Sequence, residues 1–302
     1  MAYIEADYFG GAGTRTAQVW TGGKALGPLH LAETETSPAA VISSGFPYVG
    51  APGFPAARSA AMMKGMIVAA TQFAPVAGDI DANVRTIAGL IRAAGADGAR
   101  LVVFAELAVT GYEPTLIRDI PGLVLTEDDA RLEPVRDACR AVSAAAVVNG
   151  PVHTAEGRPT VTSLVIGPDG GLLARYDKQH LYGIEQEVFA AGGRDGRFEL
   201  KGTRFALATC YDNRFPELAE RAAADGCTVY LASSVLSADN DSFEKVYPVR
   251  AREFGLHVVL GNVLGNNEDG VGCGAAGAWG PDGERTADAG TEVPGHVLAE
   301  VG

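Results

Sequence analysis

The chain has 302 residues, and its 24 lysines and arginines stand against 37 aspartates and glutamates, which gives a net charge of −13. A surface with this charge repels phosphate, so a protein that binds the nucleic-acid backbone is excluded. Hydrophobic residues make up 47% of the chain, enough for a large core, but no apolar run approaches the ~18 residues that span a bilayer.

Residues 1–65 differ in composition from the rest of the chain. They contain 10 glycines and 5 prolines, and the stretch 43–59 (SSGFPYVGAPGFPAARS) has the turn-forming residues of a linker. Strand-like pieces occur only around Thr16–Trp20 and Leu29–Ala32, too few to bury a core. We therefore predict an irregular extension and linker over residues 1–65 and a folded domain over residues 66–302.

The positions of the four methionines leave the origin of this extension open. They are Met1, Met62, Met63 and Met66, and regular patterning begins just after the last of them. Either translation starts at one of the three later methionines, or the segment is a genuine extension that packs on the body or on a partner. A peptide from residues 2–24 in the native protein would exclude the late start.

From residue 66 onward, strand-like and helix-like segments alternate. Short apolar runs predict strands at 66–72, 100–106, 204–210, 227–234 and 256–263. Apolar residues at helical spacing, as in Val84, Ile87, Ile91 and Ala94, predict helices at 81–98, 126–145, 215–226 and 239–255. Turn signals predict hairpin-linked strands within 147–177 and a further hairpin at 275–286. This alternation predicts a layered α/β fold whose helices cover a largely buried sheet.

Two charged residues stand where predicted strands end. Glu106 follows an apolar strand in LVVFAELAVTGYEP, and the apolar flanks predict a buried carboxyl whose pKa is raised toward the range of a general base. Lys178 follows the strand LLARYD, and Glu185 or Glu187 could hold its ammonium in place. The nearby His180 is better interpreted as a local hydrogen-bonding residue than as a base.

Cys210 ends the strand RFALATC and precedes a helix, with Pro216 in the first turn and Asp212 or Asn213 as the cap. A thiol at such a junction is surrounded by backbone N–H groups, so we expect a lowered pKa and an adjacent oxyanion site. A lone cysteine would be read as a small buried hydrophobe, but Glu106 and Lys178 accompany this one.

The segments FAELAVTGYEP, RYDKQHL and TCYDNRFPEL, in this order, resemble the three signature segments of the nitrilase (carbon-nitrogen hydrolase) superfamily. The resemblance covers roughly residues 66–302 and implies an α-β-β-α sandwich, often paired into a homodimer. It implies a catalytic triad of Glu106, Lys178 and Cys210, with Glu185 as a supporting glutamate because it begins the pattern ExxxFxxG. Ala105 departs from the family, which usually carries proline there.

The resemblance also implies a mechanism. Glu106 would act as the base, Cys210 as the nucleophile that forms a thioester, and Lys178 with the backbone N–H of Tyr211 as the donors to the oxyanion. Tyr112 and Tyr182 are candidate substrate-binding residues. The substrate would be a small linear amide or an N-carbamoyl compound, cleaved to acid and ammonia.

Two alternatives remain. The first is hydrolysis of a nitrile by the same triad, although true nitrilases of the family generally carry tryptophan where Tyr211 follows the cysteine. The second is a binding protein on this fold in which the triad is silent. Thiol reactivity separates these possibilities, because only an active triad predicts that Cys210 reacts much faster than the other cysteines.

The chemistry of this site requires no cofactor and no metal. Cys139, Cys210, Cys227 and Cys273 are widely spaced, and none has a partner at the spacing of zinc ligands. The acidic start MAYIEADYFG lacks the features of a secretion signal, so we expect a cytoplasmic protein whose four thiols are free.

Overall fold

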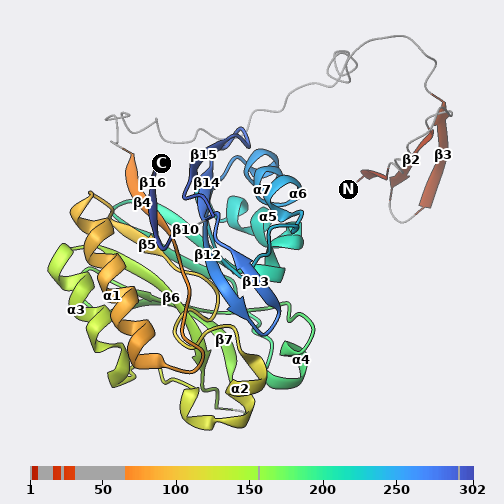
Figure 1. Ribbon diagram of the computed structural model, residues 1–302. Coiled ribbons are helices and arrows are strands. Elements are labelled where there is room, and N and C mark those ends of the chain that lie inside the picture. The colour runs from red at the N-terminus through yellow and green to blue at the C-terminus, as the bar shows by residue number, and fades with distance from the viewer. Residues whose placement is uncertain (1, 6–15, 22–23, 31–64, 156, 292) are drawn as a thin grey trace. The chain divides into compact units, whose positions relative to one another are not determined.

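The computed structural model describes residues 65–155, 157–291 and 293–302 and, before them, three strands (Figure 1). These strands, β1 (Ala2–Glu5), β2 (Thr16–Thr21) and β3 (Lys24–His30), form an antiparallel sheet in this order. β2 covers the piece predicted at Thr16–Trp20. β3 contains Leu29, the start of the piece predicted at Leu29–Ala32. The end of that predicted piece and the linker predicted at 43–59 lie outside the described residues. Contacts divide the chain into two units, residues 1–59 and 60–302.

The larger unit is built on thirteen hydrogen-bonded strands in its described part, nine of them in one continuous path and four beside it. In chain order they are β4 (Met66–Phe73), β5 (Leu101–Val103), β6 (Ala145–Val152), β7 (Thr160–Ile166), β8 (Leu172–Asp177), β9 (Gly196–Leu200), β10 (Thr203–Thr209), β11 (Val229–Ser234), β12 (His257–Asn267), β13 (Gly270–Cys273), β14 (Gly277–Trp279), β15 (Arg285–Asp288) and β16 (Gly295–Val301). The hairpin predicted at 275–286 is confirmed as β14 and β15, which pair antiparallel.

Seven helices lie in the described part of this unit. They are α1 (Ile80–Ala96), α2 (Pro114–Asp119), α3 (Glu133–Val142), α4 (Glu185–Val188), α5 (Pro216–Ala224), α6 (Ser242–Lys245) and α7 (Tyr247–Phe254). The single helix predicted at 239–255 is wrong, because Pro248 has no N–H to bond to the carbonyl of Glu244 and the helix breaks before it. None of the described helices is long and apolar enough to cross a membrane.

The path of strands folds into two facing sheets. β8, β7, β6, β5 and β4 form one sheet, and β16 adds to β4 along seven residue pairs. β9, β10, β11 and β12 form the other, with β14 and β15 beyond them. The sheets join where β4 meets β12, through only two residue pairs. Val68 and Ala70 of the first sheet therefore share a core with Phe205 of the second, whereas Ala69 points the other way into a separate core.

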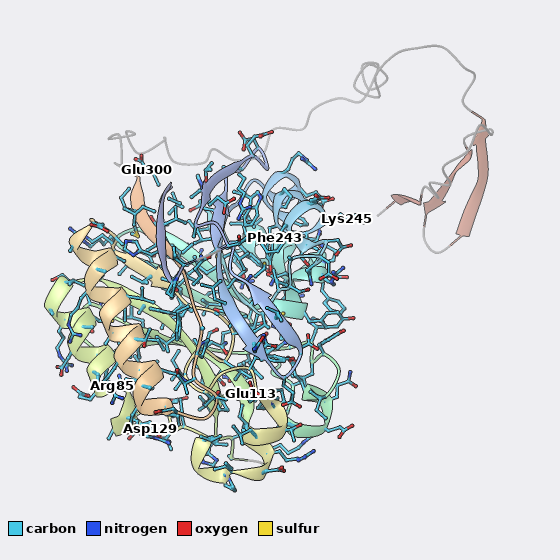
Figure 2. All side chains as sticks on the ribbon, in the orientation of Figure 1. Arg85, Glu113, Asp129, Phe243, Lys245 and Glu300 are labelled. Carbon is cyan, nitrogen blue, oxygen red and sulfur yellow. The ribbon has the colours of Figure 1, made fainter. Side chains whose placement is uncertain are left out.

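Helices cover the outer face of each sheet, which completes an α-β-β-α sandwich. α1 and α3 lie side by side on the first sheet, and α5, α6 and α7 gather on the second (Figure 1). The helical spacing predicted this for α1, whose residues Val84, Ile87, Ile91 and Ala94 are all buried. Arg85 lies on its exposed face (Figure 2). The predicted fold class is confirmed.

Strand direction brings three predicted site residues to one edge of the sandwich. β4 runs parallel to β5 and β12, β5 to β6, and β12 to β11 and β10, while β7 is antiparallel to both β6 and β8. β5, β8 and β10 therefore all point the same way, and their carboxyl ends share one edge. Glu106, Lys178 and Cys210 follow these ends, where ligands bind in many open α/β sheets.

Candidate active site

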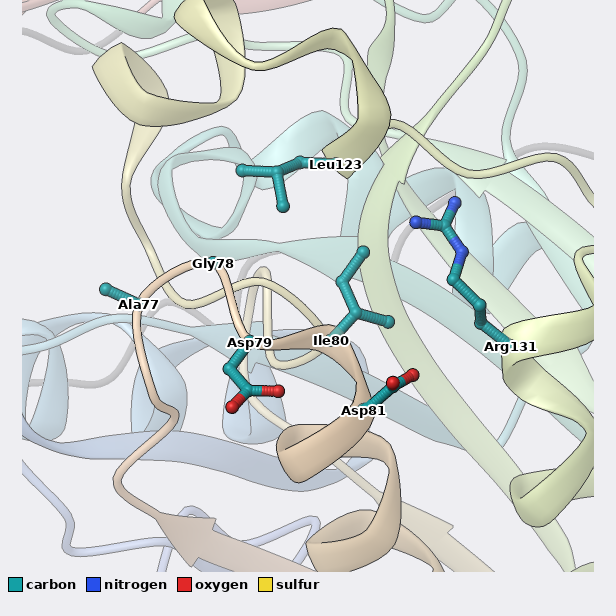
Figure 3. A pocket seen from close by; sticks show the side chains of 7 residues that line it. All are labelled: Ala77, Gly78, Asp79, Ile80, Asp81, Leu123 and Arg131. Carbon is teal, nitrogen blue, oxygen red and sulfur yellow. The ribbon is translucent and has the colours of Figure 1, made fainter.

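Two cavities lie outside the cluster of predicted site residues. One, of about 420 Å³, surrounds the start of α1 and is lined by Asp79, Asp81 and Arg131 among others (Figure 3). Asp79 caps α1 by accepting the N–H of Ala82, and Arg131 is paired with Asp129. The other, of about 720 Å³, lies against the β8 residues Arg175 and Asp177. Neither is lined by a cysteine, so neither fits the thiol chemistry predicted from the sequence.

A buried ammonium bridges two carboxylates at the shared edge of the sheets. Lys178 Nζ donates to Glu106 Oε1 at 2.7 Å and lies 2.8 Å from each carboxylate oxygen of Glu185. The three side chains are at most 1% exposed. Because an unpaired charge at such a depth is very costly, the three groups depend on one another for their ionised forms.

The structure discriminates between the two glutamates that could support Lys178. Glu185 opens α4 and is buried, whereas Glu187 is exposed. Besides Lys178, the carboxylate of Glu185 accepts the hydroxyl of Tyr112 at 2.8 Å and the backbone N–H of Tyr182 at 2.9 Å. Its oxygens are thus held from three sides, which orients Lys178 toward Glu106.

The rest of the pattern ExxxFxxG has a physical basis in the same turn. The N–H of Phe189 donates to the carbonyl of Glu185 at 2.8 Å, and the Phe189 ring is fully buried. Gly192 donates its N–H to the carbonyl of Lys178 at 2.8 Å. A Cβ at position 192 would overlap the carbonyl of Asp177, so only glycine allows the two backbones this approach.

Cys210 follows β10 in a strained conformation and begins a 3-10 turn, Cys210–Arg214. Its φ is 47°, in the left-handed region that non-glycine residues rarely adopt. The half-buried thiol lies 3.8 Å from the carbonyl oxygen of Val235. The predicted caps are wrong: α5 begins at Pro216 after Phe215, with no side-chain cap. The turn separates α5 from the thiol, and the backbone N–H of Tyr211 directly follows Cys210.

The carboxyl of Glu106 has the properties of a general base. Burial raises the pKa of Glu106 to about 8, although the Lys178 charge lowers it, and the Glu185 charge raises it further. Its second oxygen, Oε2, has no well-aligned hydrogen-bond partner among the described residues. The thiol of Cys210 is nevertheless close enough to lower the pKa of this carboxyl. Oε2 is therefore free to take a proton from the sulfur.

The thiol and the ammonium respond differently to this environment. Burial and the charge of Glu106 raise the pKa of Cys210 well above its usual value, and Lys178 offsets this only in part. The lowered thiol pKa expected from the sequence is therefore wrong, because the site is acidic and enclosed. For Lys178, burial lowers the pKa, but the charges of Glu106, Cys210 and Glu185 outweigh it and raise the value. The resting site holds a thiol and an ammonium.

The two tyrosines predicted to bind substrate occupy different positions. Tyr112 is buried, its hydroxyl is bonded to Glu185, and burial raises its pKa. Tyr182 is 50% exposed, and its ring lies 5.3 Å from that of Tyr211. Contact with substrate remains a prediction for both residues.

Asn149, which was not among the predicted site residues, shapes the turn after Glu106. Leu107 has a φ of 48°, and its N–H donates to Asn149 Oδ1 at 2.7 Å. Asn149 is fully buried in β6, and its amide donates to Ser163 Oγ at 3.0 Å. A single amide among the apolar residues of AAVVNGPV was the available signal, because buried polar groups are there to form hydrogen bonds.

Among the described residues, no group of three or more His, Cys, Asp or Glu side chains is placed to hold a metal ion. The four cysteines are free thiols. The site itself offers a thiol, two carboxyl groups and an ammonium.

Comparison with known proteins identifies the family. The model of the carbon-nitrogen hydrolase family matches residues 67–302. The chain belongs to this family. It lies in the amidase-like branch of the nitrilase superfamily and is an enzyme that acts on carbon–nitrogen bonds other than peptide bonds.

Curated relatives of this chain include amidases. It is 30% identical over 227 residues to omega-amidase NIT2 of Homo sapiens, covering 70% of this chain and 79% of that protein. It is 29% identical over 214 residues to 2-oxoglutaramate amidase of Bacillus subtilis, covering 67% of this chain and 78% of that protein.

The fold is also similar to solved structures of an amidase from Nesterenkonia sp. AN1. One is a complex with butyramide, with a TM-score of 0.72 and 27% identity, covering 78% of this chain and 91% of that one. Another has the acetamide moiety of fluoroacetamide covalently added at the active site cysteine, with the same score and identity, covering 78% and 90%. That enzyme therefore carries a reactive cysteine in a similar fold.

Proposed function

We propose that this enzyme hydrolyses a small linear amide or an N-carbamoyl compound to an acid and ammonia, through a thioester on Cys210. The observation that carries the proposal is the free oxygen of Glu106 beside a protonated thiol, with the other oxygen of Glu106 held by Lys178. Nucleophile, base and cation meet in one buried cluster, as cysteine-based acyl transfer requires. The amidases to which the chain is similar support the same reaction class.

In the first half of the reaction, Glu106 takes the proton of Cys210 as the sulfur attacks the carbonyl carbon. Negative charge moves to the carbonyl oxygen. An ammonium has three N–H donors, and the two carboxylates account for two of those on Lys178, so the third is available to the oxyanion. The backbone N–H of Tyr211 is the second donor, and each donor is worth about 3 kcal/mol of barrier.

In the second half, the proton on Glu106 passes to the nitrogen of the leaving group, the carbon–nitrogen bond breaks, and ammonia or an amine departs from the thioester. Glu106 is again a carboxylate and now takes a proton from water, which attacks the thioester carbon. The carbon–sulfur bond breaks, the proton returns to sulfur, and the acid leaves. Glu185 keeps Lys178 in place throughout.

The test is ammonia release by the purified enzyme on a panel of aliphatic amides, N-carbamoyl amino acids and nitriles. We expect release from amides or carbamoyl compounds, an acyl adduct on Cys210 by mass spectrometry, and no release by Cys210→Ala. Cys273→Ala is the matched control, because Cys273 is the other half-buried cysteine. Turnover by Cys210→Ala, or hydrolysis of nitriles alone, would contradict the proposal.

Thiol modification separates an active enzyme from a silent scaffold. Iodoacetamide should alkylate Cys210 at least tenfold faster than the other three thiols, because the carboxyl of Glu106 lies beside Cys210 and can take its proton. Burial raises the pKa of all four thiols, to about 12 for Cys139, so the difference in rate must come from this base. Equal rates at all four would favour a binding protein.

From the family resemblance we further propose that the enzyme is a homodimer or larger homo-oligomer. From the sequence we propose that it acts in the cytoplasm and that residues 1–65 are an extension of the hydrolase domain 66–302. Size-exclusion chromatography with light scattering, on the full chain and on a chain that begins at Met66, tests the oligomeric state and the domain boundary. A monomeric full chain would contradict the first, and loss of folding in the shorter chain the second.

A further inference from the structure

A third fully buried carboxylate, that of Asp212, lies two residues after Cys210. Asp212 Oδ1 accepts the backbone N–H of His180 at 2.8 Å and that of Gln179 at 3.2 Å. His180 Nδ1 also lies 2.9 Å from this oxygen. Asp212 Oδ2 accepts the hydroxyl of Tyr176 at 2.6 Å and the backbone N–H of Thr209 at 3.1 Å. Both oxygens are thus saturated.

These donors come from both sheets. Tyr176 lies in β8 of the first sheet, and Gln179 and His180 directly follow Lys178, just beyond the end of that strand. Thr209 ends β10 of the second sheet and directly precedes Cys210. One carboxylate therefore joins the segment that carries the cation to the segment that carries the nucleophile, within two residues of each.

We propose that Asp212 is a positioning residue that sets the separation of Cys210 and Lys178; this inference rests on the function proposed above. Cys210 is held at a φ of 47°, which it would leave if its neighbours did not restrain it. The bond from Thr209 to Asp212 restrains it on one side. The bonds from Gln179 and His180 fix the same carboxylate to the backbone beside Lys178.

Asp212 also accepts the N–H of Thr209 as the third residue of a capping box on the turn Cys210–Arg214, but this local role uses only Oδ2. No lysine or arginine lies within ion-pairing distance of Asp212 in the part of the chain that the structure describes; the imidazole of His180 lies beside it instead. The His180 ring is stacked on Phe215 at 3.6 Å, which keeps it beside the carboxylate. Three of its partners are backbone N–H groups and one is a tyrosine hydroxyl. The carboxylate therefore acts mainly as a hydrogen-bond acceptor that links these segments of the chain.

An asparagine cannot satisfy the same donors. Its side chain has one carbonyl oxygen and one NH₂ group, so whichever way it turns, the NH₂ faces at least one backbone N–H. If the NH₂ takes the place of Oδ2, it opposes Thr209; if it takes that of Oδ1, it opposes Gln179 and His180. Either the Cys210 segment or the Lys178 segment must then move, and a displacement of about 1 Å in such a site costs on the order of 100-fold in rate.

The experiment compares Asp212→Asn and Tyr176→Phe with Asp129→Asn. Asp129 is a partly buried acid at the start of the turn before α3 and is labelled in Figure 2. Each variant is assayed for kcat and KM, with kcat divided by the number of Cys210 thiols that iodoacetamide titrates, and for its thermal midpoint. Counting reactive thiols removes the effect of any unfolded fraction.

We expect Asp212→Asn to lower kcat per titrated thiol about 100-fold with KM changed less than threefold. Tyr176→Phe removes one of the donors and should lower it by less, about three- to tenfold. Asp129→Asn should change the thermal midpoint but not kcat per thiol. A kcat per thiol within threefold of wild type in Asp212→Asn would overturn the proposal, whatever happens to the midpoint.

If Asp212→Asn does not fold, Tyr176→Phe decides, because it keeps the carboxylate; unchanged kcat per thiol in Tyr176→Phe then overturns the proposal. Failure of the proposed function has a different signature. If the proposed function fails, Cys210→Ala still releases ammonia. If only the inference about Asp212 fails, Cys210→Ala is inactive but Asp212→Asn keeps a kcat per titrated thiol within threefold of wild type.

Discussion

Replacing Lys178 by methionine removes the one cation that holds Glu106 and Glu185 together while keeping most of the side-chain volume. Removal of one partner from a buried ion pair costs about 3–5 kcal/mol in free energy of unfolding. Here we expect the lower end, about 3 kcal/mol, because the pKa of Glu106 is already about 8 with the ammonium present. Without the ammonium the pKa of this carboxyl rises further, so its proton uptake at neutral pH is complete and removes the rest of its buried charge.

The same proton uptake sets the effect on turnover. Loss of an oxyanion donor alone lowers kcat by about 10²–10³. A protonated Glu106 cannot act as base either, so we expect at least a 10³-fold loss of ammonia release. Urea unfolding measures the first quantity and initial rates on the best amide of the panel the second.

The matched control is Lys245→Met, since Lys245 is 70% exposed and its pair with Asp241 spans 3.5 Å (Figure 2). Its free energy of unfolding should stay within about 0.5 kcal/mol of wild type and its rate unchanged. Turnover of Lys178→Met within tenfold of wild type would refute the role of Lys178, and an unchanged free energy of unfolding would refute the argument about buried charge.

Two further predictions concern Glu106 and the turn after it. The value of kcat/KM should rise with pH around about 8, where Glu106 ionises. Because the pKa of Glu106 is raised in the folded state, its favourable contribution to stability is full below the unfolded value and is lost as the pH rises through about 8. In urea unfolding, wild type should therefore lose stability with rising pH relative to Glu106→Gln; parallel curves would contradict this. Asn149→Ala should cost about 1–3 kcal/mol and at least tenfold in rate, because it orphans the buried N–H of Leu107. Ser163→Ala, which removes only the other bond of Asn149, should cost less in both urea unfolding and rate, and an equal effect of the two changes would contradict the role given to Leu107.

The elements with a strong local signal were predictable from the sequence. α1 shows an apolar residue at each expected turn and begins one residue from the predicted start. The strands β4, β11 and β12 are short apolar runs with turn signals at their ends, and all three were predicted. Such segments form because local preference and burial agree.

The missed elements lack that agreement. β16 (GHVLAEV) has half-buried and exposed positions, and it becomes a strand because β4 offers it a free edge along seven residue pairs. The strand predicted to reach Glu106 ends instead at Val103, because the backbone turns at Leu107 into a left-handed conformation that Asn149 stabilises from another strand. These are long-range effects, and no local pattern of residues encodes them.

The candidate site divides in the same way. Glu106, Lys178 and Cys210 were predicted from the sequence, because each lies in a short motif of characteristic residue types. Glu185 was also preferred to Glu187 as the supporting glutamate. The residues that hold them, Asn149 and Asp212, were missed or misread, since each acts on backbone far away in the sequence. The thiol pKa was predicted with the wrong sign for a related reason: backbone N–H groups at a strand end are visible in the sequence, whereas enclosure beside two carboxylates is not.

The raised pKa of Cys210 does not oppose the proposed chemistry. Counted over Glu106, Lys178, Glu185 and the thiol, the resting cluster with Glu106 ionised carries one net negative charge. Loss of the thiol proton to solvent would add a second negative charge to a buried site, and this is why burial and Glu106 raise the thiol pKa. Transfer of the same proton to Glu106 leaves the net charge unchanged. A carboxyl with a pKa of about 8 is a strong enough base to accept this proton. Proton transfer from Cys210 to Glu106 is therefore favoured over proton loss to the solvent. The cluster should therefore react when an electrophile is in place to take up the charge of the sulfur, and the thiol should remain largely protonated otherwise.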